Sequence, residues 1–107
     1  MKSAKIWIDD IREPPSDGWW ICRSVIAAKT TIRTLEEKDY IIEVISIDHD
    51  AGDYACLGGD YIKVLDWLEE NNKSFPIHIH TMIPVGRQNM EAIIRKNNWV
   101  EVRHLWN

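Results

Sequence analysis

The sequence predicts an α/β domain in which a mostly parallel, five-stranded sheet lies between layers of helices. Three observations support this fold class. Apolar segments of strand length alternate with amphipathic segments of helix length, which is typical of parallel sheets with right-handed crossovers. Three of the apolar segments end abruptly in charged or imidazole side chains, as strands do at the functional edge of an open sheet. The 107 residues, 45% of them hydrophobic, have room for one core, which predicts a single domain over residues 1–107.

The first half of the chain predicts three strands and one helix. Residues 5–8 form a buried apolar strand, and the two prolines and the glycine within residues 9–18 exclude a helix after it. Residues 19–23 predict a second strand. The extended return before it favours parallel pairing with the first strand, whereas a hairpin would make the pairing antiparallel. An amphipathic helix then runs from Ser24 or Val25 to Glu37 and precedes a strand over residues 41–47.

The second half predicts two helices and two further strands. A polar loop precedes a helix that opens at residues 58–60 and closes at the asparagine pair 71–72. Residues 77–80 predict the fourth strand, and another helix follows Gly86. Residues 99–105 alternate between apolar and polar side chains, which predicts an edge strand as the fifth.

The predicted strand order is 2-1-3-4-5, as in flavodoxin-like domains, with the helix after strand one missing. This order places strands one, three and four side by side, so their carboxyl ends share one edge of the sheet. The polar side chains that follow these strands are therefore expected to converge there: Asp9, Asp10, Asp48, His49, Asp50, His80 and Thr81.

Two histidines and two carboxylates are the predicted catalytic residues at this edge. His49 and His80 are predicted to act as general base and general acid, because an imidazole titrates near neutral pH and passes a proton in both directions. Asp10 and Asp48 complete the catalytic set and are also the predicted ligands of a hard divalent cation, Mg²⁺ or Mn²⁺. Because clustered carboxylates repel one another, Arg12 is the alternative partner for them. A mechanism based on histidines alone and a metal-assisted mechanism both stay open.

A phosphate group has its own candidate ligands. The helices that begin near Gly59 and Gly86 are expected to point their N-termini at the same edge, where free amides and the helix dipole favour an anion. Arg12 and Arg87 can each add a bidentate contact to phosphoryl oxygens. For Trp19 two interpretations stay open: a core residue, or a platform that stacks on a base.

Charge and composition exclude several classes of partner. The formal net charge of −4 argues against an extended nucleic-acid surface and against binding to an anionic membrane. No apolar run approaches the length of a signal peptide or a transmembrane helix, so the expected location is cytoplasmic. Cys22 and Cys56 lack metal-type spacing and are expected to be free thiols. His78 and His104 are interpreted as structural.

Several of these positions resemble response-regulator receiver domains. Asp9 and Asp10 look like the acidic pair of receivers, Asp48 like their phosphoacceptor and Thr81 like their switch threonine. Two features differ from receivers. The helix after strand one is missing, and residues 103–104 read Arg-His where receivers place Lys-Pro in strand five.

The details that differ from ordinary receivers resemble the cyclic-phosphate processing receiver family. In that family the segment after strand four reads His-Ser, followed two residues on by Asn-Pro. Here Thr81 keeps the hydroxyl, and Ile83 replaces the amide. Four segments match the family in order: residues 9–19, 46–50, 59–61 and 80–90.

The resemblance implies a receiver-like fold and a phosphoesterase that acts on a cyclic phosphate. The substrate would be a cyclic nucleotide or the 2′,3′-cyclic phosphate end of an RNA. Together with the anion-binding candidates above, the match gives the expected substrate-binding set: Arg12, Gly59, Thr81, Arg87 and Asn89. Two alternatives stay open. One is a receiver-like switch that is phosphorylated on Asp48, and the other is a nucleotide-binding module without catalysis.

Overall fold

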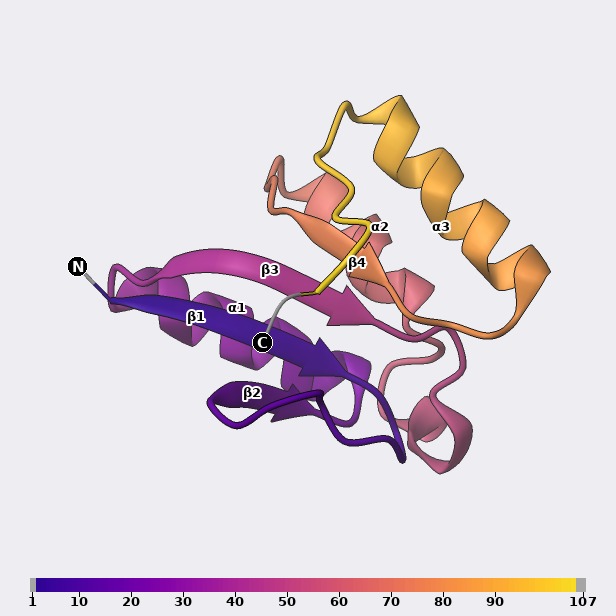
Figure 1. The fold of residues 1–107 in the computed structure, drawn as a ribbon, viewed down its shortest axis with the longest axis horizontal. Helices are drawn as coiled ribbons and strands as arrows, with labels where there is room; N and C mark the ends of the chain where they lie inside the picture. The colour runs from indigo at the N-terminus through magenta and orange to yellow at the C-terminus, as the bar shows by residue number, and fades with distance from the viewer. Residues whose placement is uncertain (1, 106–107) are drawn as a thin grey trace.

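Four parallel strands form the sheet, in the order β2-β1-β3-β4 (Figure 1). The structure is a computed structural model that describes residues 2–105. β1 (Ser3–Ile8) pairs with β2 (Trp19–Cys22) on one side and with β3 (Ile41–Ile47) on the other, and β4 (Ile77–Ile79) pairs with β3. For these four strands, the predicted order and the parallel pairing of the second strand are confirmed.

Residues 9–18 connect β1 to β2 without a helix, as their prolines predict. Two tryptophans hold this segment in place. Nε1 of Trp19 donates a hydrogen bond to Oγ of Ser16 at 3.1 Å, and Nε1 of Trp7 donates to the carbonyl oxygen of Arg12 at 2.9 Å. The connection therefore stays beside the carboxyl end of β1.

The helices cover one face of the sheet. Their buried side chains share a single core cluster with Ile6 and Ile8 of β1 and with Ile45 and Ile47 of β3, which alternate along the strands toward the same face. Ser24 caps the first helix, since its Oγ accepts a hydrogen bond from the amide of Ala27 at 3.0 Å. The three helices are α1 (Val25–Glu37), α2 (Ile62–Glu70) and α3 (Pro84–Lys96).

The second face of the sheet carries a smaller apolar cluster of Trp7, Trp19 and Val44. Within residues 2–105, no helix contributes to this cluster. Val102 and Leu105 pack against it instead, and the C-terminal segment crosses this face in Figure 1. The predicted layer of helices on both faces is therefore wrong. The connection after β1 has no helix to supply a third layer, so a short extended segment covers part of this face.

Residues 99–105 do not form the predicted fifth strand. A single parallel bridge joins Glu101 to Ile77, whose amide donates to Val100 at 2.9 Å and whose carbonyl accepts from Val102 at 2.7 Å. β4 is only three residues long, so the ladder ends there. Beyond the bridge, Val102 and Leu105 bury apolar area on the second face, which favours departure from the sheet edge.

Residues 51–61 also differ from the expected loop and helix start. Gly52–Cys56 forms a short 3-10 helix, η1, and α2 begins only at Ile62. The φ angles of Gly58 and Gly59 are +113° and +94°, outside the range of a right-handed helix, so the glycine pair ends η1 rather than opening α2.

Cys22 is buried and Cys56 is exposed, and both are free thiols, as expected. Among the residues described, no helix is both long enough and apolar enough to cross a membrane.

Candidate active site at the carboxyl ends of the strands

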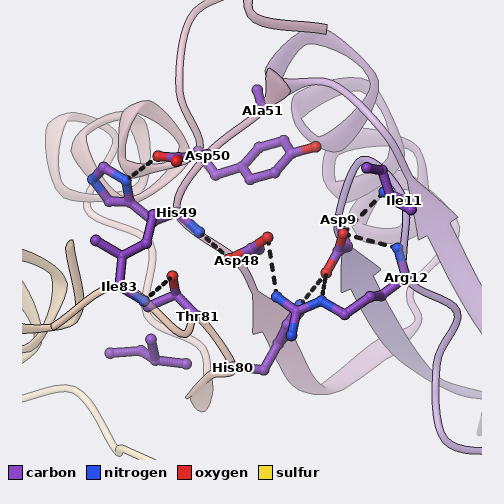
Figure 2. Close-up of polar contacts among 12 residues, drawn as sticks. Asp9, Ile11, Arg12, Asp48, His49, Asp50, Ala51, His80, Thr81 and Ile83 are labelled. Atoms are coloured by element: carbon purple, nitrogen blue, oxygen red, sulfur yellow. Dashed lines mark hydrogen bonds and ion pairs between the residues drawn. The ribbon is translucent and has the colours of Figure 1, made fainter. Parts of the chain in front are cut away.

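Three strands end in register, which brings three site residues side by side. Ile8 of β1 lies opposite Ile47 of β3, and Ile47 lies opposite Ile79 of β4. Main-chain hydrogen bonds of 3.0 Å continue both ladders one residue further. The residues that follow these strands are Asp9, Asp48 and His80, and Figure 2 shows them grouped at this edge. The predicted convergence of the strand ends is present for these three residues.

The guanidinium of Arg12 joins two of the carboxylates. Its Nε lies 3.1 Å from Oδ2 of Asp9, and its Nη2 lies 3.2 Å from Oδ2 of Asp48 (Figure 2). The turn after β1 positions it, because Oδ1 of Asp9 accepts the amides of Ile11 and Arg12, each at 3.0 Å. Burial alone would raise the pKa of Asp9, but these amides and His80 outweigh it and lower that pKa below its ordinary value. Asp9 is therefore an ionised carboxylate in a fixed orientation.

Asp10 lies in a different environment. Within residues 2–105 it has no ion pair, and its Oδ2 lies so close to η1 that a Cβ added to Gly52 would overlap it. Burial raises the pKa of Asp10, and the neighbouring carboxylates of Asp9 and Asp48 raise it further. Asp10 therefore holds a proton more readily than an ordinary aspartate does.

The three aspartates have a donor set that fits a hard divalent cation. One oxygen from each of Asp9, Asp10 and Asp48 lies within 4.8 Å of the others, and Mg²⁺ and Mn²⁺ prefer carboxylate ligands. Arg12 already provides positive charge to Asp9 and Asp48, but none to Asp10. A bound cation would share the first two carboxylates with Arg12 and would be the positive partner of Asp10. The predicted ligands thus lie together, with Asp9 as a third.

His80 is held on three sides. Its Nε2 lies 2.8 Å from Oδ2 of Asp9, and its Nδ1 lies 2.7 Å from Oγ of Ser46. Its ring stacks on Trp7 with a centroid distance of 4.0 Å and an interplanar angle of 3°. The side chain is only 9% exposed, and this burial lowers the pKa of His80 more than Asp9 raises it. Both ring nitrogens are therefore engaged inside the protein.

The side chain of His49 points to the opposite side of Asp48 from His80 (Figure 2). Its Nδ1 lies 2.7 Å from Oδ1 of Asp50, and its amide donates to Oδ1 of Asp48 at 2.8 Å. A Cβ added to Gly86 would lie 2.6 Å from Cγ of His49, so the ring rests directly on the first turn of α3. The side chain is 20% exposed, and Nε2 has no partner among the residues described. The two histidines do not face each other.

Two of the expected phosphate ligands near α3, Arg87 and Thr81, make contacts within the fold. Nη2 of Arg87 donates to the carbonyl oxygens of Ile79 at 2.9 Å and Thr81 at 3.5 Å. Thr81 is buried, and its Oγ1 accepts the amide of Ile83 at 3.2 Å. Asn89 is exposed on α3. Arg87 and Thr81 thus close the turn between β4 and α3.

Gly59 lies outside this group of contacts. Its amide donates to the carbonyl oxygen of Ala55 at 2.8 Å, so it is not directed at an anion. The segment before α2 supports the site differently, since the amide of Tyr61 donates to the carbonyl oxygen of His49 at 3.0 Å.

Two residues of the site have no role in the sequence-based prediction. Ser46 is fully buried and binds both His78 and His80, and Trp7 stacks on His80 while fixing the main chain at Arg12. Ser46 carries a sequence signal, because a hydroxyl within an apolar strand requires a buried hydrogen-bond partner. Trp7 gives no such signal, since a large aromatic residue in a strand is ordinary core.

Comparison with known protein families agrees with this geometry. The sequence profile of the cyclic-phosphate processing receiver domain matches residues 4–96, from β1 to the end of α3. The chain belongs to this family. The resemblance predicted from the sequence is therefore confirmed, and the cyclic-phosphate processing receiver domain includes the whole acidic centre described above. No curated protein and no solved structure matches the chain significantly.

Proposed function

We propose that this domain is a phosphoesterase that opens a cyclic phosphate by adding water. The substrate is a cyclic nucleotide or the 2′,3′-cyclic phosphate end of an RNA. Family membership supports the class of substrate. The observation that carries the proposal is the imidazole of His49, which Asp50 holds through Nδ1 at 2.7 Å while Nε2 has no protein partner among the described residues. An oriented and accessible imidazole suits proton transfer at neutral pH.

In the proposed reaction, a water molecule attacks phosphorus while Nε2 of His49 accepts one of its protons. The bond between phosphorus and one ribose oxygen breaks, and Asp10 donates a proton to that oxygen. The raised pKa of Asp10 supports this role, and the engaged nitrogens of His80 make it a weaker candidate for the acid. The product is a phosphomonoester beside a free hydroxyl. Proton exchange with solvent then restores His49 and Asp10.

Arg12 is the proposed partner of the phosphoryl oxygens. Its side chain is 44% exposed, Asp9 and Asp48 fix its orientation, and its Nη1 has no partner within residues 2–105. A guanidinium held in place before the reaction stabilises charge that develops on phosphate without reorganising. A divalent cation on the three aspartates would be an alternative to the acid role of Asp10, because a carboxylate that coordinates the cation holds no proton; the cation would then supply electrostatic stabilisation of the phosphoryl group and of the departing oxygen.

The test is a turnover screen with cyclic mononucleotides, cyclic dinucleotides and RNA that ends in a 2′,3′-cyclic phosphate, with and without chelator. His49→Gln should lower turnover by roughly 10²- to 10⁴-fold, the range for loss of a general base. His104→Gln, the same substitution outside the site, is the matched control. Full turnover in His49→Gln would contradict the assignment.

Two other results would assign a different function to the domain. A phosphoryl adduct after incubation with acetyl phosphate and Mg²⁺, absent in Asp48→Asn, would indicate a receiver switch. Tight nucleotide binding without product would indicate a binding module.

A further inference from the structure

A chain of four side chains leads from the second face of the sheet into the acidic centre. Nδ1 of His78 lies 2.8 Å from Oγ of Ser46, and the same Oγ lies 2.7 Å from Nδ1 of His80. Nε2 of His80 then lies 2.8 Å from Oδ2 of Asp9. Ser46 is 0% exposed, so its hydroxyl is shielded from bulk water. The proposed reaction uses neither Ser46 nor His78.

With neutral imidazoles, only one direction of donation satisfies all three hydrogen bonds. Ionised Asp9 can only accept, so Nε2 of His80 must carry its hydrogen. The neutral ring then has a lone pair at Nδ1, to which the hydroxyl of Ser46 must donate. Because Ser46 has a single hydrogen, its oxygen must accept from His78. His78 therefore carries its hydrogen at Nδ1.

The surroundings favour the neutral rings that this assignment requires. Burial lowers the pKa of His78 to about 4, and His80 and Arg87 add smaller effects in the same direction. Around His80, the stacked face of Trp7 excludes water from the ring, and the side chain is only 9% exposed.

We propose that Ser46 and His78 are positioning residues for the acidic centre. They fix the direction of the hydrogen-bond chain and thereby keep the Nε2 hydrogen of His80 donated to Asp9. Asp9 in turn holds Nε of Arg12 at 3.1 Å, so the chain ends on the guanidinium assigned to the phosphate. Partners one shell away from a working group hold its orientation in this manner. The catalytic consequence rests on the proposed function, whereas the bond directions do not.

The first test is the tautomeric state of each ring in the wild-type protein. Long-range ¹H–¹⁵N correlation spectra at pH 7, assigned with His78→Gln and His104→Gln, distinguish a protonated from a bare ring nitrogen. We expect hydrogen at Nδ1 in His78 and at Nε2 in His80. Hydrogen at Nε2 of His78, or at both nitrogens of His80, would overturn the chain. This readout does not depend on any enzymatic activity.

The second test removes the central hydroxyl. In Ser46→Ala, His78 should lose its preference for the Nδ1 form, while His49, held by Asp50, should keep its spectrum as an internal reference. Turnover should fall by about 10- to 100-fold, with most of the loss in kcat rather than KM. Ser46→Thr, which keeps the hydroxyl, should retain both properties, and Ser74→Ala, at an exposed position, is the matched control.

Each outcome of the second test has one meaning. An unchanged His78 spectrum in Ser46→Ala overturns the chain. A changed spectrum with full turnover overturns the positioning role. If the wild type turns over no cyclic phosphate, the proposed function fails, while the tautomers still decide the chain. If Ser46→Ala fails to fold, the wild-type spectrum alone decides between the two states of His78.

Discussion

Replacing Gly86 with alanine tests whether the packing of the His49 ring against α3 matters for catalysis. The added Cβ would lie 2.6 Å from Cγ and 2.7 Å from Cδ2 of His49, whereas ordinary contacts begin at 3.4 Å. The ring must therefore withdraw by about 0.8 Å, the difference between the shortest contact and the ordinary limit. A misplacement of about 1 Å can cost on the order of 10²-fold in rate. We expect Gly86→Ala to lower hydrolysis of a 2′,3′-cyclic nucleotide by roughly that factor.

The stability of the same variant separates this effect from unfolding. Gly86 has a helical backbone, and alanine is favoured over glycine within a helix by up to about 1 kcal/mol. The overlap with Cβ and Cγ of His49 costs about 1–3 kcal/mol, which this preference only partly offsets, so the melting temperature should fall modestly while the protein stays folded at the assay temperature. Gly18→Ala is the matched control, because it loses stability without touching His49. Its Cβ meets nothing within 4 Å, but its φ of +89° should cost about 1 kcal/mol and leave turnover intact. Wild-type turnover in Gly86→Ala would refute the proposed role of the contact between His49 and Gly86.

Three further predictions concern the metal, the pH dependence and Arg87. Mg²⁺ or Mn²⁺ at ten times its Kd should stabilise the fold by about 1.4 kcal/mol, and Asp10→Asn should abolish the response. An unresponsive wild type beside a responsive Arg12→Ala would instead show that Arg12 alone neutralises the carboxylates. Denaturant unfolding should show stability rising from pH 4 to pH 6.5, because unfolded His78 binds a proton near its ordinary pKa of 6.5 and folded His78 only near 4. His78→Gln should flatten this slope, and an unchanged slope would count against a neutral His78. Arg87→Gln should lower stability by about 1 kcal/mol at unchanged KM, because its guanidinium supports main-chain carbonyls of the turn before α3. A tenfold rise in KM without loss of stability would assign Arg87 to the phosphate instead.

The sheet order was predictable because local signals and topology agree. The prolines after β1 exclude a helix, the helical segments require crossovers, and the polar residues that follow Ile8, Ile47 and Ile79 mark aligned strand ends. The edge strand was not predictable. The alternation over residues 99–105 fits a strand, but it fits equally well a segment that lays one side on an apolar surface, and the pattern does not identify the partner.

The residues that form the candidate site were easier to predict than the orientation of their side chains. Asp9, Asp48 and His80 come together because each directly follows a strand. The direction of the His49 ring depends on how α3 packs against it and on the absence of a Cβ at Gly86. Neither feature can be inferred from the residues next to His49 in the sequence. The position of His49 at the strand end was thus predictable, whereas its packing against Gly86 was not.

The most direct test of hydrolysis by His49 is the product formed from a 2′,3′-cyclic phosphate by wild-type protein, His49→Gln and His104→Gln, followed by chromatography and mass spectrometry. We expect a linear phosphomonoester, one water heavier than the substrate, from the wild type and His104→Gln, and a loss of roughly 10²-fold or more in His49→Gln. No linear product from any cyclic phosphate, or equal product from all three proteins, would contradict this expectation.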